Sequence, residues 1–151
     1  MTIIVYLLLR NCIMIDLPKH KKLILFDGVC NLCNSAINYV IKHDKKHIFM
    51  FAPLESHIGK QIIKTYNINT VKTDSIILYN PEKGIDFKST AALKVGSQLG
   101  FPTNLMVIFL IVPAFIRNWV YDFIAKNRYK WYGKKETCMI PTPELKGRFL
   151  G

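Results

Sequence analysis

The chain has 151 residues, of which 50% are hydrophobic and 21% are charged, and its formal net charge is +11. This length and composition predict one globular domain with its own core and exclude a disordered protein. The positive charge favours acidic partners or anionic surfaces. Because the basic residues are spread along the chain without a dense run, we do not expect nucleic-acid binding.

The first residues differ in composition from the rest. Residues 3–9 are apolar, no basic segment precedes them, and Arg10 interrupts them. This run is too short for a transmembrane helix and is a poor signal peptide. We therefore predict an N-terminal arm or upstream extension over residues 1–20 and a single domain over residues 21–151. The four cysteines do not resemble a dense disulfide framework, so a cytoplasmic location is expected.

The clearest chemical signal follows the first predicted strand. Residues 23–27 form a short apolar run that stops at Gly28, and Cys30 and Cys33 follow at the start of a helical pattern. Residues i and i+3 are neighbours on a helix, so the two thiols can come within disulfide distance. The first turn of a helix also stabilises a thiolate. Strand, turn, CxxC and helix together indicate a site for thiol–disulfide exchange.

Further apolar patterns predict the rest of the fold. The predicted elements are a strand at 48–51, a helix at 58–66, a hairpin of strands at 75–79 and 85–88, a helix from the N-cap Ser89 to Leu99, and helices over 103–131 that Pro113 interrupts. A βαβ unit joined through a helix to a ββα unit is the thioredoxin arrangement. The predicted class is therefore α/β and thioredoxin-like, with a central four-stranded sheet and an added C-terminal helical region.

One apolar stretch invites a membrane interpretation. Residues 101–115 are strongly apolar, but they fall short of the roughly twenty residues that a spanning helix needs. We predict a core helix that covers the sheet, and we do not favour peripheral membrane contact. The aromatic residues Trp119, Tyr121, Trp131 and Tyr132 are expected in the core with polar tips at the surface.

Two alternatives to redox chemistry concern the CxxC pair itself. The pair could be purely structural, or it could form half of a zinc site, which needs two further ligands. The candidate ligands are His43, His47, His57 and Cys138. No second CxxC pattern accompanies them, so we favour the redox interpretation and expect neither a metal nor an organic cofactor.

The two thiols are expected to differ in role. We predict that Cys30, exposed at the helix mouth, attacks, and that Cys33, one turn further and less accessible, resolves the mixed disulfide. Asp27 has two interpretations that the residues alone leave open: it forms the turn, or it is the base for the resolving thiol. A phosphoryl-transfer role for Asp27, as in haloacid-dehalogenase-like enzymes, needs an acid where Val29 stands and leaves the cysteines unexplained.

The expected partners are a protein or small-molecule thiol or disulfide substrate and an external reductant. A second hypothesis is a non-catalytic binding or adaptor module, in which residues 128–131 contribute to a basic, aromatic C-terminal surface. Cys138 is predicted to be an ordinary thiol, because it has no partner at motif spacing. The alternative is a third redox centre.

Several separated motifs resemble the DCC family of predicted thiol-disulfide oxidoreductases, named for an Asp followed by two Cys. The matching segments are 26–33, 51–54, 74–75, 88–89, 127–129 and 131–134. The resemblance spans roughly residues 22–150, and it implies a thioredoxin-fold variant whose site is Asp27, Cys30 and Cys33. The resolving thiol must also lose its proton before it attacks. For both reasons we favour the role of Asp27 as the base for that thiol. Residues 71–74 lack the proline that ordinary thioredoxins place before the third strand, which leaves the mode of substrate docking open.

Overall fold

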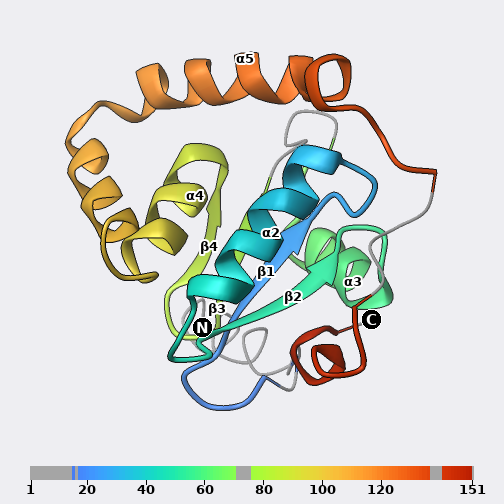
Figure 1. Ribbon diagram of the computed structural model, residues 1–151. Coiled ribbons are helices and arrows are strands. Elements are labelled where there is room, and N and C mark those ends of the chain that lie inside the picture. Colours follow the sequence, from blue (N-terminus) through green and yellow to red (C-terminus); the bar gives the residue numbers. More distant parts are fainter. Residues whose placement is uncertain (1–14, 16, 71–75, 137–140, 151) are drawn as a thin grey trace, which may run out of the picture.

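A four-stranded sheet forms the centre of the computed structural model, which describes residues 15, 17–70, 76–136 and 141–150 (Figure 1). The strands are β1 (Lys22–Phe26), β2 (Phe49–Pro53), β3 (Ile77–Asn80) and β4 (Gly84–Phe87). Their spatial order is β2-β1-β3-β4, with β1 parallel to β2 and antiparallel to β3, and with β3 antiparallel to β4. This mixed α/β arrangement is consistent with a thioredoxin-like fold, and the predicted hairpin of β3 and β4 is confirmed.

The central strand β1 is apolar on both faces because helices cover both sides of the sheet. Ile24 and Phe26 face one core, and Leu23 and Leu25 face the other. All four side chains are buried. Such a continuous apolar run is typical of an inner strand with two covered faces.

The helices divide between the two faces. The helices α2 (Asn31–His43) and α4 (Lys88–Ser97) pack on one face through residues such as Ile37 and Val95. On the other face lies α3 (His57–Thr65), which buries Ile62. Because β1, α2 and β2 form a βαβ unit, α2 begins directly above the end of β1 and carries the CxxC motif there.

The C-terminal helical region lies beside this core. It consists of the 3₁₀ helix η1 (Thr103–Ile111), the helix α5 (Ala114–Tyr132) and the short 3₁₀ helix η2 (Lys146–Arg148). In Figure 1, α5 crosses the end of the sheet at which α2 begins. No described helix is long and apolar enough to cross a membrane.

The prediction of a core helix over residues 101–115 is wrong. No residue of η1 is buried, and η1 packs against α4 rather than against the sheet. The physical reason is that α2 and α4 already occupy that face of the sheet. The expectation that Trp119, Trp131 and Tyr132 lie in the core is also wrong, since all three are exposed.

Ser89 is not the N-cap of its helix. The N-cap is Phe87, and α4 begins at Lys88. Ser89 is instead buried, and its hydroxyl bonds to Asn118 and Arg117 of α5. The serine therefore ties two helices together, a role that sequence spacing does not indicate.

The C-terminal segment returns to the edge strand β2. The ring of Phe149 packs against Phe26 and Phe51, and the Leu150 N–H donates to the Phe51 carbonyl at 2.8 Å. Arg148 forms an ion pair with the buried Asp44, with Nη2 and Oδ2 2.6 Å apart. Cys138 and the segment 71–74, which carry expectations from the sequence, lie outside the described residues.

Candidate active site

Cys30 is the N-cap residue of α2. Its backbone is extended (φ −78°, ψ 121°), and its Sγ accepts a hydrogen bond from the Cys33 N–H at 3.3 Å. An N-cap side chain satisfies one of the free amides of the first helical turn, and a sulfur there lies at the positive end of the helix dipole. The motif therefore places the first cysteine at the N-terminus of α2, as the sequence predicts.

The turn before Cys30 is shaped by Asp27. Its Oδ1 accepts the Val29 N–H at 3.1 Å, and its carbonyl accepts the Cys30 N–H at 3.3 Å. This is the local side-chain-to-backbone bond expected of an Asp-Gly turn. It occupies only one of the two carboxylate oxygens.

The expectation that Cys30 is exposed is wrong, because its exposed fraction is 0%. A covering segment, residues 133–135, lies over the CxxC loop. Cys30 forms an isolated antiparallel bridge with Lys134, and the Lys135 N–H donates to the Val29 carbonyl at 2.7 Å. The covering segment is distant in sequence, so the pattern around the motif could not indicate it.

Asn31 fastens the covering segment to the start of α2. Its Nδ2 donates to the Tyr132 carbonyl at 2.8 Å, and its backbone N–H donates to the Gly133 carbonyl at 3.4 Å. Gly133 adopts φ +81°, and a Cβ on it would lie 3.1 Å from the Asn31 Nδ2. Glycine is therefore favoured here by its backbone conformation, and a larger residue would also displace the Asn31 side chain by a few tenths of an ångström.

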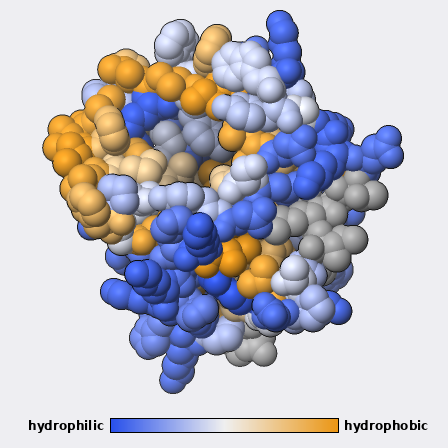
Figure 2. All heavy atoms as spheres, in the orientation of Figure 1, coloured by the Kyte–Doolittle hydropathy of each residue, from blue (hydrophilic) through white to orange (hydrophobic). Residues whose placement is uncertain are grey.

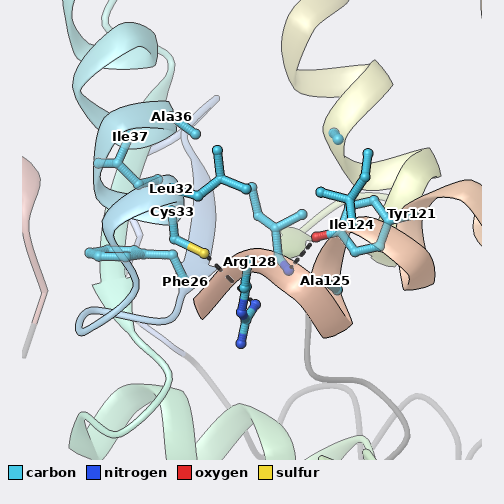
Figure 3. A pocket seen from close by; sticks show the side chains of 11 residues that line it. Phe26, Leu32, Cys33, Ala36, Ile37, Tyr121, Ile124, Ala125 and Arg128 are labelled. Carbon is cyan, nitrogen blue, oxygen red and sulfur yellow. Dashed lines mark hydrogen bonds between the residues drawn. The ribbon is translucent and has the colours of Figure 1, made fainter. Parts of the chain in front are cut away.

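The expectation that Cys33 is the less accessible thiol is also wrong, because Cys33 is more exposed than Cys30. Cys33 is partly exposed and lines a cavity of about 180 Å³ between α2, α4 and α5 (Figure 3). The rest of the lining is mostly apolar and includes Leu32, Ala36, Ile37, Ile76, Ala92 and Ile124. An apolar group could therefore bind beside the sulfur of Cys33.

Two residues of α5 complete the site. The Arg128 Nη2 lies 3.0 Å from the Asp27 Oδ2, and the Tyr129 hydroxyl donates to the same oxygen. The Arg128 Nη1 lies 3.8 Å from the Cys33 Sγ (Figure 3). The guanidinium group therefore connects the carboxylate to the second thiol.

The surroundings of Cys33 keep its thiol protonated. Burial raises the pKa of Cys33, the neighbouring Cys30 raises it further, and the positive charge of Arg128 acts in the opposite direction. Burial, and the hydrogen bond to Asp27, also raise the pKa of Tyr129 to about 12. At neutral pH the Cys33 thiol and the Tyr129 hydroxyl therefore both remain protonated.

The structure brings Asp27, Cys30 and Cys33 together, and it joins Arg128 and Tyr129 to them. In the sequence these two residues belong to the basic, aromatic C-terminal surface and to the family-like motif 127–129, and neither is predicted as a site residue. The sequence signal that could have identified them is the resemblance of residues 127–129 to the family pattern. Within the described part of the chain, no three His, Cys, Asp or Glu side chains gather as a metal site would need.

Comparison with known proteins identifies the family of the chain. Residues 24–134 match the model of the DCC1-like thiol-disulfide oxidoreductases. The chain is 46% identical to the uncharacterized protein YuxK of Bacillus subtilis (strain 168) over 130 residues, which cover 86% of this chain and 94% of YuxK. It is 32% identical to a chloroplastic DCC family protein of Arabidopsis thaliana over 121 residues, which cover 80% of this chain and 70% of that protein. No solved structure gives a significant match. The chain therefore belongs to the DCC1-like thiol-disulfide oxidoreductase family.

Proposed function

We propose that this protein exchanges thiols and disulfides through Cys30 and Cys33, with Arg128 and Asp27 assisting the second step. The observation that carries the proposal is the position of Cys30 as the N-cap of α2, where its sulfur accepts the Cys33 amide N–H. The family match supports the same chemistry. No bound organic cofactor is needed, because the two sulfurs carry the electrons.

In the reducing direction the Cys30 thiolate attacks a substrate disulfide. A bond forms between Cys30 and one substrate sulfur, and the other substrate sulfur leaves as a thiolate. The Cys33 thiolate then attacks the Cys30 sulfur, which forms the Cys30–Cys33 disulfide and releases the second substrate thiol. The substrate gains two electrons, and an external dithiol, as expected in a reducing cytoplasm, returns the pair to the reduced state.

The assignment of the two roles follows from electrostatics. The Cys30 sulfur accepts the Cys33 amide N–H at the N-terminus of α2, the end of a helix that favours negative charge, so we assign the first attack to Cys30. The raised pKa of Cys33 makes its thiol a poor first nucleophile, so it needs a proton acceptor when it resolves the mixed disulfide. We assign this acceptor to Asp27, and we assign to Arg128 the stabilisation of the developing charge on the Cys33 sulfur.

Access to Cys30 requires a local movement. Because Cys30 is fully buried beneath residues 133–135, the covering segment must move before a substrate disulfide can reach the sulfur. The cavity beside Cys33 then receives an apolar group of the substrate, such as a side chain next to the disulfide.

Trapping of mixed disulfides tests the proposal. The Cys33→Ser variant should accumulate a mixed disulfide on Cys30 when it is mixed with a peptide disulfide, and mass spectrometry would identify the linked residue. The matched Cys30→Ser variant should accumulate little, because the Cys33 thiol is protonated. Accumulation on Cys33 alone would reverse the roles. If the wild-type protein forms no intramolecular disulfide in any glutathione buffer, the redox proposal fails.

A cellular test separates catalysis from the adaptor hypothesis. If the fold serves only as a binding module, a folded Cys30→Ser/Cys33→Ser variant keeps its function in cells. We expect the double variant to lose function.

A further inference from the structure

The helix α5 turns its apolar side away from the protein. Its exposed large side chains follow helical spacing and include Phe115, Ile116, Trp119, Val120, Phe123 and Ile124. Phe115 is 75% exposed and Trp119 is 71% exposed. A surface helix of a water-soluble domain normally buries its apolar stripe and exposes its polar one, so this orientation is the reverse of the usual one.

Polar contacts hold α5 in this orientation. Arg117 donates to the hydroxyls of Ser89 and Thr90, and Asp122 forms an ion pair with Lys88 at 2.8 Å. Further along, Arg128 reaches Asp27. Three charged residues of α5, Arg117, Asp122 and Arg128, therefore bond to the domain, and the large apolar residues are left on the outside.

The preceding 3₁₀ helix extends the same surface. In η1 the exposed large side chains are Leu105, Val107, Ile108, Phe109 and Ile111. Figure 2 shows the apolar residues of η1 and the start of α5 as a continuous band along one edge of the molecule. We call this band, together with Trp131 and Tyr132, the η1–α5 surface. An apolar patch of this extent on a domain marks a site of contact with a membrane or another protein.

Charge distinguishes between the candidate occupants. Residues 103–135 contain six basic residues and a single acid, Asp122, which is paired with Lys88. Lys126, Lys130, Lys134 and Lys135 are exposed near the aromatic residues. A second copy of a chain with a net charge of +11 would bring like charges together, whereas an anionic surface would be attracted.

We propose that the η1–α5 surface binds the interface of an anionic lipid bilayer. Aromatic side chains such as Trp119 and Trp131 are suited to the headgroup region, and lysines reach from it to phosphate groups. The apolar residues of η1 would enter the edge of the acyl region, as in other interfacial helices. Ile124 belongs both to this surface and to the lining of the cavity at Cys33, so the bilayer would lie beside the entrance to that cavity. The proposal does not depend on the thiol chemistry.

The two tryptophans report on this surface directly. The chain contains only Trp119 and Trp131, and both are exposed on the η1–α5 surface. Vesicles of phosphatidylcholine with about one third phosphatidylglycerol should shift the tryptophan emission to the blue and sediment the protein, and pure phosphatidylcholine vesicles should do so much less. Because surface charges are screened by salt, high ionic strength should weaken the binding.

Matched variants separate this surface from the overall charge. Lys126→Glu/Lys130→Glu should lower the partition coefficient on anionic vesicles by about tenfold or more. Lys60→Glu/Lys64→Glu, two exposed lysines at the same spacing on α3, change the net charge equally and should bind several times more tightly than the α5 variant. Trp119→Ser should weaken binding, and Tyr66→Ser, an exposed aromatic on another part of the molecule, should not.

Three results would overturn the proposal. The first is an unchanged emission spectrum with no sedimentation. The second is equal loss of binding in the two double-lysine variants, which would show only non-specific attraction. The third is a concentration-dependent dimer in sedimentation analysis whose tryptophans become buried without lipid, which would assign the surface to self-association.

Discussion

Asp27 and Arg128 stand 101 residues apart in the sequence and form an ion pair at one end of the sheet, with Oδ2 and Nη2 3.0 Å apart. The side chain of Arg128 is 3% exposed and that of Asp27 is 14% exposed. The pair connects the end of β1, which shapes the CxxC turn, to the C-terminal part of α5. It makes α5 part of the site rather than an appendage of the domain.

Replacement of Arg128 tests whether its charge assists the second thiol. Arg128 lies 3.8 Å from the Cys33 sulfur and lowers the pKa of Cys33, so Arg128→Met should raise that pKa further. We expect resolution of a mixed disulfide at neutral pH to slow by about tenfold, the effect of one pKa unit. Stopped-flow kinetics with a fluorescent peptide disulfide would measure this.

The control for this experiment lies on the same helix. Arg117→Met removes another guanidinium group of α5, whose contacts with Ser89 and Thr90 do not reach the thiols. It should leave the resolution rate unchanged once the folded fraction is taken into account. A wild-type rate in Arg128→Met would remove Arg128 from the proposed mechanism.

The two oxygens of Asp27 allow its roles as a turn residue and as a base to be separated. Asn can keep the Oδ1 bond to the Val29 N–H, so Asp27→Asn should preserve the turn. The charge of Asp27 raises the pKa of Cys33, so loss of charge alone should speed resolution. If Asp27 is the base, resolution should instead slow by about 10²–10⁴-fold. The direction of the change therefore decides between the two roles.

The pH dependence gives a second readout of the same variant. Because the pKa of Cys33 is raised, its thiolate fraction near neutral pH is small and increases about tenfold per pH unit below that pKa. Resolution by Asp27→Asn should therefore accelerate as the pH rises, and the wild-type rate should rise less steeply. Parallel pH profiles for the two proteins would reject a proton acceptor at this position.

Asn31 should control the exposure of Cys30. Its side chain bonds to the Tyr132 carbonyl at the start of the covering segment, so Asn31→Ala should loosen residues 133–135. Alkylation of Cys30 by iodoacetamide, followed by peptide mass spectrometry, should become several times faster. Asn38→Ala, on the exposed side of the same helix, should leave the rate unchanged. If both variants react like the wild type, the covering segment does not limit access.

Arg148 should contribute more to stability than an exposed ion pair does. Its partner Asp44 is fully buried, so Arg148→Met leaves a charge in the core without its counterion. We expect the free energy of unfolding to fall by about 3 kcal/mol in urea titrations. Lys94→Met breaks the more exposed pair with Asp86 and should cost less than about 1 kcal/mol. Equal losses would show that the buried pair has no special role.

The sequence by itself determined the local parts of this protein. Apolar runs with a period of two or 3.6 residues specify the strands and helices, and the βαβ order specifies the sheet. The spacing of Cys30 and Cys33 after a strand and a turn specifies the dithiol motif, because all of its geometry lies within one helical turn. The turn formed by Asp27 is local for the same reason.

The tertiary structure decided what surrounds these parts. The bridge of Cys30 with Lys134 and the ion pair of Asp27 with Arg128 both join residues about a hundred positions apart. The reversed orientation of α5 depends on polar partners in α4, which no periodicity within α5 indicates. A local pattern records only which residues are apolar or charged. Which neighbour each residue meets is decided when the chain brings distant segments together.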